Sequence, residues 1–140
     1  LALFVLPKEI EKKILSMVSP EDFEKDEARK FWMWIGDIIK TSKTNSQETL
    51  FKKLPRDLAG FVDYLFLINI NPAFSERELW ALEIVKIANS LKRMSIKRKL
   101  SDISGQLRKA QSAGDQKQIA TLAKKFDKVS NLLKSSNFNE

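Results

Sequence analysis

The sequence contains no cysteine and no histidine in its 140 residues. Without cysteine, a disulfide framework and thiol chemistry are excluded, and the lack of histidine removes nearly every remaining pattern of zinc ligands. Long apolar runs are also missing. The longest candidate, residues 61–70, is interrupted by Asp63 and Asn69 and is shorter than the roughly 20 residues that span a bilayer. We therefore expect a cytoplasmic protein with no membrane partner.

Carboxylates and lysines are the acid–base groups that remain. Six acidic residues stand where helices are expected to start, and capping or the helix dipole accounts for them there. These residues are Glu21, Asp22, Asp26, Glu76, Glu78 and Asp115. No Asp-x-Asp pair and no regularly spaced Glu-x-x-x-Glu cluster points to a carboxylate metal site. We expect no active site, no cofactor and no metal in this chain.

The composition predicts an all-α chain with a true core. Apolar residues make up 43% of the sequence, which is enough at this length. No strand-like alternation persists over six positions, whereas apolar residues recur at helical spacing. Short helices are expected near Pro7, Asp26, Ser46 and Pro55, and a long one from Ser75, which opens a capping box. The aromatic residues on their apolar faces are interpreted as core: Trp32, Trp34, Phe61, Tyr64 and Trp80.

The last third of the chain carries two narrow apolar seams. They are spaced alternately by four and three residues, as in a heptad repeat. The first comprises Ile96, Leu100, Ile103, Leu107 and Ala110, and the second Ile119, Leu122, Phe126, Val129 and Leu133. Between them, Gly114 suits a helix C-terminus and Asp115 the next N-cap. A turn this short predicts an antiparallel helical hairpin.

The apolar face of the long helix changes direction before the hairpin. Trp80, Ile84, Ile87 and Leu91 predict one buried stripe, with a second beside it at Ala81, Val85 and Ala88. From Leu91, however, the next seam residue, Ile96, follows after five positions. Five residues turn the apolar face by about 140°. We therefore expect a multi-helix bundle over residues 1–93, followed by a C-terminal hairpin over 94–140 that projects from it, the two sharing a long helix at 75–112.

Positive charge is concentrated in the second part. Residues 1–85 carry 12 Lys or Arg against 14 Asp or Glu, whereas residues 86–140 carry 13 against 4. A segregated basic surface attracts nucleic acid or an acidic protein, although a solvated helix face explains the charges equally well. The candidate phosphate contacts are Lys92, Arg93, Lys97, Arg98 and Lys99.

A two-helix hairpin has a single seam, so its apolar burial barely offsets the conformational entropy lost on ordering it. Such an element is usually kept because a partner binds it. The expected apolar contacts are Leu122, Phe126, Val129, Leu132 and Leu133. Lys124, Lys125 and Lys128, together with Lys117, Arg108 and Lys109, are expected at the rim, where charges steer association.

Several segments, in order, resemble the C-terminal domain of bacterial DNA primase. They are Leu-Ala-Leu-Phe-Val-Leu-Pro (1–7), Ser-Pro-Glu-Asp-Phe (19–23), Leu-Pro-Arg-Asp-Leu (54–58) and Leu-Lys-Arg-Met-Ser-Ile-Lys-Arg-Lys-Leu (91–100). The segment from Lys109 to Phe126 resembles the closing hairpin of that family. The resemblance spans essentially the whole chain but rests on pattern and order rather than on one specific motif. A start at Leu1 also suggests a piece of a longer protein.

The resemblance implies a helicase-binding domain, in which a hairpin after a helical bundle docks on the N-terminal domains of the hexameric replicative helicase. Such a domain brings the primase to the replication fork and modulates the helicase, while primer synthesis belongs to other parts of the parent enzyme. Three alternatives remain open. They are an N-terminal-type domain of the helicase itself, a basic nucleic-acid-binding module, and a homodimer that pairs two hairpins into a four-helix bundle.

Overall fold

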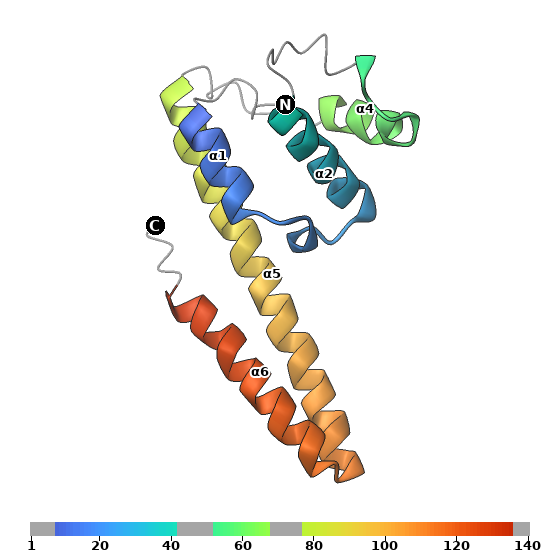
Figure 1. The fold of residues 1–140 in the computed structure, drawn as a ribbon, viewed down its shortest axis with the longest axis vertical. Coiled ribbons are helices and arrows are strands. Elements are labelled where there is room, and N and C mark those ends of the chain that lie inside the picture. The colour runs from blue at the N-terminus through green and yellow to red at the C-terminus, as the bar shows by residue number, and fades with distance from the viewer. Residues whose placement is uncertain (1–7, 42–51, 68–76, 136–140) are drawn as a thin grey trace. The chain divides into compact units, whose positions relative to one another are not determined.

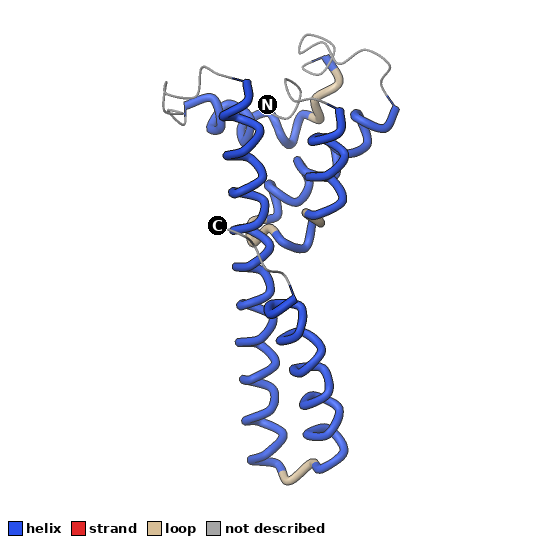
Figure 2. Tube along the Cα trace, turned by 90° about the vertical axis from the view of Figure 1, so that its left-hand side faces the viewer, coloured by secondary structure: helices blue, strands red, loops and turns tan. Residues whose placement is uncertain are grey.

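The computed structural model describes residues 8–41, 52–67 and 77–135, and every regular element within these ranges is helical (Figures 1 and 2). The elements are α1 (Lys8–Met17), the 3₁₀ turn η2 (Pro20–Asp22), α2 (Asp26–Thr41), the 3₁₀ turn η3 (Arg56–Leu58), α4 (Ala59–Leu67), α5 (Arg77–Ala113) and α6 (Gln116–Ser135). The all-α prediction is therefore confirmed. The expected helix start at Ser46 and the capping residue Ser75 lie outside the described residues.

The chain divides into two compact units, residues 1–88 and 89–140. Helix α5 is continuous across this boundary, as the shared long helix of the sequence prediction requires. The boundary lies after Ala88, whereas the change of apolar face led us to expect it after Arg93. The two positions differ because the first compact unit ends at Ala88, whereas the buried face of α5 changes only after Ser95.

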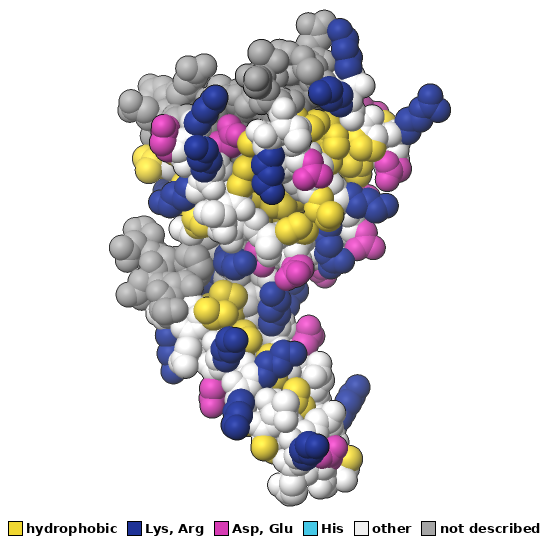
Figure 3. Space-filling view, in the orientation of Figure 1, with side chains coloured by type: hydrophobic (Ala, Val, Ile, Leu, Met, Phe, Trp, Pro, Cys, Tyr) yellow, Lys and Arg dark blue, Asp and Glu magenta, His cyan; other side chains and the backbone are white. Residues whose placement is uncertain are grey.

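The first unit is built on aliphatic residues of several helices. Its buried apolar residues are Ile14, Val18, Ile35, Ile38, Leu58, Val62, Ala81 and Ala88. Phe31 joins two of these helices, with ring centroids 5.7 Å from Trp34 and 5.6 Å from Phe61. Hydrophobic side chains also gather on the outer surface of this unit (Figure 3). Tyr64, expected in the core, is 55% exposed because α4 is apolar on nearly every side and only one of its faces is covered.

The indole groups of α2 are tied to carbonyl groups before and after that helix. Trp32 donates from Nε1 to the carbonyl oxygen of Val18 at 3.1 Å, and Trp34 donates to that of Lys53 at 3.2 Å. A half-buried indole N–H needs an acceptor, and these bonds supply one without breaking the helical ladder. Trp32 and Trp34 are partly buried, and their Nε1–H groups hold the chain at Val18 and Lys53 beside α2.

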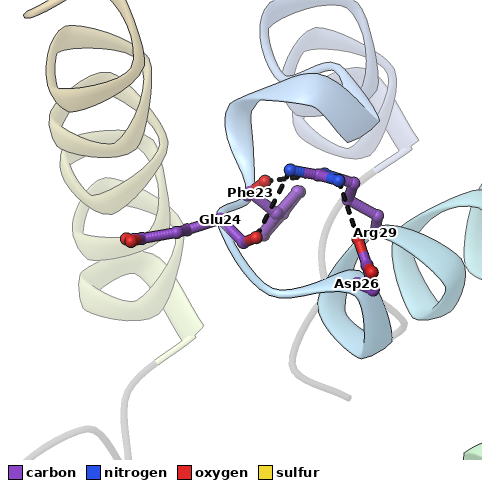
Figure 4. Close-up of polar contacts among 4 residues, drawn as sticks. All are labelled: Phe23, Glu24, Asp26 and Arg29. Carbon is purple, nitrogen blue, oxygen red and sulfur yellow. Dashed lines mark hydrogen bonds and ion pairs between the residues drawn. The ribbon is translucent and has the colours of Figure 1, made fainter. Parts of the chain in front are cut away.

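The start of α2 is held by an arginine that reaches backward along the chain (Figure 4). The Arg29 guanidinium donates from Nε to the Phe23 carbonyl at 2.9 Å, and another nitrogen donates to the Glu24 carbonyl at 3.3 Å. It also pairs with the Asp26 carboxylate at 2.7 Å. Asp26, expected as the N-cap, is instead the first helical residue, and its carboxylate bonds to this guanidinium.

The turn before α2 is closed by a buried carboxylate. The backbone N–H of Ser19 donates to Asp22 Oδ2 at 2.9 Å, and the Ser19 hydroxyl lies 3.2 Å from the same oxygen. The Asp22 side chain is fully buried. Pro20 occupies the first position of η2, where its lack of an N–H costs no hydrogen bond. Ser19, Pro20 and Asp22 therefore stand at the positions predicted for them in this turn.

Helix α5 buries two series of residues that are each spaced by seven. The series are Ala81, Ala88 and Ser95, then Ile96, Ile103 and Ala110. Seven residues return to nearly the same face of a helix, whereas the single step from Ser95 to Ile96 turns it by about 100°. The predicted change of face is therefore present, one step beyond Met94. Ile87, expected in the first stripe, is 59% exposed, because the small side chains of Ala81 and Ala88 occupy the buried line in its place.

The hairpin turn combines two helix-ending devices. Gly114 has a φ of +69°, and its N–H donates to the Gln111 carbonyl at 3.1 Å, while the Asp115 N–H donates to the Ala110 carbonyl at 3.0 Å. This pair of bonds is a Schellman motif. Asp115 Oδ1 then accepts from the Gln118 N–H at 3.0 Å, which caps α6. Both sequence assignments in this turn are confirmed.

A matched pair of substitutions tests the backbone of this turn. Gly114→Ala places a side chain at positive φ, with no other atom within 4 Å of the added carbon, and should lower the free energy of unfolding by about 1–2 kcal/mol. Gly105→Ala lies within α5, where space is also open, and should raise it by about 0.5–1 kcal/mol. Urea unfolding followed by circular dichroism measures both. Equal effects of the two substitutions would contradict the assigned turn conformation.

Candidate functional site

The C-terminal hairpin has its own small apolar core. Ile103, Ala110 and Leu122 are buried in it, with exposed fractions of 3%, 1% and 6%. Leu107, Ile119, Phe126 and Val129 pack against them from both helices and are partly buried. Seven of the ten predicted seam residues therefore lie where α5 and α6 pack, whereas Ile96, Leu100 and Leu133 do not belong to this cluster. No residue of this cluster comes from outside the second unit.

This packing divides the predicted partner contacts into two groups. Leu122, Phe126 and Val129 lie in the seam, so most of their apolar surface is already used to hold α6 on α5. Leu132 is 51% exposed, and Leu133 is half-buried. The accessible apolar surface among these residues therefore lies near the end of α6, at Leu132 and Leu133. Leu122, Phe126 and Val129 instead hold α6 against α5.

The lysines of α6 point away from the seam. At about 100° per residue, Lys117, Lys124 and Lys128 fall within about 40° of one another, on the side of the helix opposite Leu122 and Phe126. All three are exposed, as is Lys125 beside them. Figure 3 shows Lys and Arg side chains along the described surface of the hairpin, with few Asp or Glu among them. We call Lys117, Lys124, Lys125 and Lys128 the α6 lysine row.

The basic cluster predicted at residues 92–99 is not gathered on one face. Lys92 and Arg98 are half-buried, whereas Arg93, Lys97 and Lys99 are exposed. Arg93 and Lys97 share a face of α5, being four residues apart, while Lys99 lies about 200° around the helix from Lys97. A flat phosphate-bearing surface would therefore meet Arg93 and Lys97 but not the whole cluster.

Sequence reasoning missed which side chains continue the face of Arg93 and Lys97. Ser101, Ser104, Arg108 and Gln111 follow at intervals of four, three, four and three residues. Arg108 was expected at the rim of the α6 surface but lies on this face of α5. The four-three spacing of these polar residues could have predicted this face, but the sequence prediction used the compact run of charges at 92–99 instead.

Within the described residues, no group of three or more acidic side chains is arranged to hold a metal ion. In the same ranges, none of the helices is both long enough and apolar enough to cross a membrane. No known protein family, curated protein or solved structure matches this chain in sequence or fold. Its function is therefore argued from the geometry of the hairpin and the resemblance described above.

The division between seam and surface predicts different costs for two truncations. Phe126→Ala removes a ring packed in the seam and should lower the free energy of unfolding by about 2–4 kcal/mol. Leu132→Ala should lower it by less than about 1 kcal/mol, because half of that side chain is exposed. Chemical denaturation of the full chain measures both. If the Leu132 variant were the less stable of the two, the assigned seam would be wrong.

Proposed function

We propose that this chain is a non-catalytic docking domain that binds the hexameric replicative helicase. In this proposal the parent protein is a bacterial DNA primase, and the domain brings it to the replication fork and modulates the helicase. One observation carries the proposal. A long helix continues from one compact unit into a second, where it ends in an antiparallel hairpin with its own core. That order of elements is what the primase resemblance implies.

The outer surface of α6 has the features of a docking site. Leu132 offers an exposed apolar anchor near the end of the helix, and half-buried Leu133 lies beside it. A partner that covers such an apolar side chain gains the free energy of removing its surface from water. The α6 lysine row flanks the anchor and favours an acidic partner, since charges at a rim mainly raise the association rate.

The seam residues support this role indirectly. Leu122, Phe126 and Val129 fix α6 against α5, so the exposed face is presented on a rigid element rather than on a loop. A binding surface that is already ordered loses less conformational entropy when the partner arrives. Substitutions at Phe126 would therefore weaken binding by unfolding the hairpin, and they do not test the contact itself.

The alternative in which this chain is an N-terminal-type domain of the helicase predicts a similar helical order. The basic charge of residues 86–140, 13 Lys or Arg against 4 Asp or Glu, favours the primase side, because a docking hairpin with exposed lysines requires a partner of opposite charge. The upstream sequence of the parent gene distinguishes the two directly.

Binding to the isolated N-terminal domains of the replicative helicase from the same organism tests the proposal. Leu132→Gln should raise the Kd about tenfold, which corresponds to about 1.4 kcal/mol, because it removes the exposed anchor. Leu82→Gln is the matched control, since Leu82 is 64% exposed on the first half of α5, and it should leave the Kd unchanged. Isothermal titration calorimetry measures all three proteins.

Two results would overturn this proposal. One is the absence of helicase binding by the unsubstituted chain at low salt. The other is a dimeric mass in solution that Leu132→Gln converts to a monomer, because the anchor would then serve self-association.

The lysine row predicts a kinetic effect. Lys124→Gln, Lys125→Gln and Lys128→Gln together should slow helicase association by about tenfold or more at low salt and change the dissociation rate little. The difference should vanish at about 1 M salt, where the Debye length is about 3 Å. Surface plasmon resonance separates the two rates. A change confined to the dissociation rate would instead place these lysines inside the contact.

A further inference from the structure

A second polar surface runs along one face of α5 within the C-terminal unit. It is formed by six side chains that carry hydrogen-bond donors: Arg93, Lys97, Ser101, Ser104, Arg108 and Gln111. We call these six residues the α5 polar stripe. At about 100° and 1.5 Å per residue, they fall within an arc of about 80° and extend over about 27 Å. All are exposed except Ser104, which is half-buried.

The stripe is separate from the seam and from the α6 lysine row. Its centre lies about 130° around α5 from the line of Ile103 and Ala110, which faces α6. The lysine row belongs to the other helix, on the side away from the seam. The two surfaces can therefore be altered independently, and neither set of substitutions touches the hairpin core.

The chemistry of the stripe favours a phosphate backbone over a protein. Its six side chains contain no carboxylate and no large apolar group, and the exposed side chain of Met94 lies at its border, about 20° outside the arc. A protein partner would therefore find little apolar surface there. Arginine, lysine, serine and glutamine are side chains that commonly donate to phosphate oxygens in protein–DNA complexes. The excess of Lys and Arg over residues 86–140 adds a long-range attraction for polyanions.

The geometry favours a duplex over a single strand. Proteins that bind single strands usually stack bases on exposed aromatic rings, and Phe126, the aromatic residue of the described hairpin, packs in the seam. A row of about 27 Å on one rigid helix approaches the 34 Å of a helical turn of B-DNA. We propose that the α5 polar stripe binds the backbone of double-stranded nucleic acid without reading its sequence.

Fluorescence anisotropy of the full chain with a labelled duplex of about 20 base pairs tests this inference. Arg93→Gln, Lys97→Gln and Arg108→Gln together should weaken binding about tenfold or more at about 50 mM salt, because three phosphate contacts are lost. The slope of log K against log salt should become less negative by about 2.7, or about 0.9 for each contact. Helicase binding by the same variant should be unchanged, which separates this test from the proposed function.

A control with the same loss of charge shows whether position matters. Lys117→Gln, Lys124→Gln and Lys128→Gln together remove three charges from α6 and should weaken duplex binding less than about threefold. If both triple variants lose the same affinity, binding follows net charge and the stripe is not the site. If the stripe variant loses helical circular dichroism, the three single substitutions replace it, each with an expected slope change of about 0.9.

Three further results would overturn the inference. The first is no binding of the unsubstituted chain to the duplex at about 50 mM salt. The second is equal or tighter binding of a single strand of the same length, which would contradict the choice of duplex. The third is competition by polyglutamate as effective as competition by unlabelled duplex at equal charge concentration, which would indicate an acidic protein as the partner.

Discussion

The packing of α6 against α5 along one narrow seam is the constraint on which the C-terminal unit depends. Two helices have only one shared side on which to bury apolar surface, so every residue placed there serves stability first. Ile103, Ala110 and Leu122 occupy the centre of that side and are nearly inaccessible. The turn at Gly114 and Asp115 sets the register, because its backbone bonds end α5 and the Asp115 side chain caps α6 within a few residues. The hairpin is therefore held by a small core and a fixed turn.

Once the seam is filled, the remaining faces of the two helices are available for other contacts. The α6 lysine row and Leu132 form one surface, and the α5 polar stripe forms another, each on a rigid helix. Their compositions differ in a way that matters for binding: the first has an apolar anchor, and the second has only hydrogen-bond donors. A protein partner suits the first and a phosphate backbone suits the second, because anchors supply affinity at protein interfaces and donors satisfy phosphate oxygens. The two proposals thus assign different partners to different faces of the same hairpin.

Much of this arrangement could be predicted because it is periodic. The four-three spacing from Ile96 to Ala110 and from Ile119 to Leu133 gave the hairpin and seven of the ten residues expected in its seam, and the glycine followed by aspartate gave the turn. The change of buried face along α5 was also predicted, although its position and the exposure of Ile87 were not. Ser95 is buried and Ile87 exposed because small side chains on a helix allow close approach, so the covered line need not follow the largest apolar residues. Leu122, Phe126 and Val129 were expected both in the seam and on a partner surface, and the structure shows that seam packing already covers most of each side chain.

The sequence by itself determined that the chain is helical, where the last two helices meet and that the positive charge lies in its second part. These properties follow from local spacing and composition, which no neighbour can alter. Only the tertiary structure decided how far each side chain is covered: Leu132 is 51% exposed beside half-buried Leu133, and Arg93 is exposed whereas Arg98 is half-buried. The physical reason is that burial is set by what another helix covers, and two leucines or two arginines with the same intrinsic chemistry differ only in the neighbours that folding gives them.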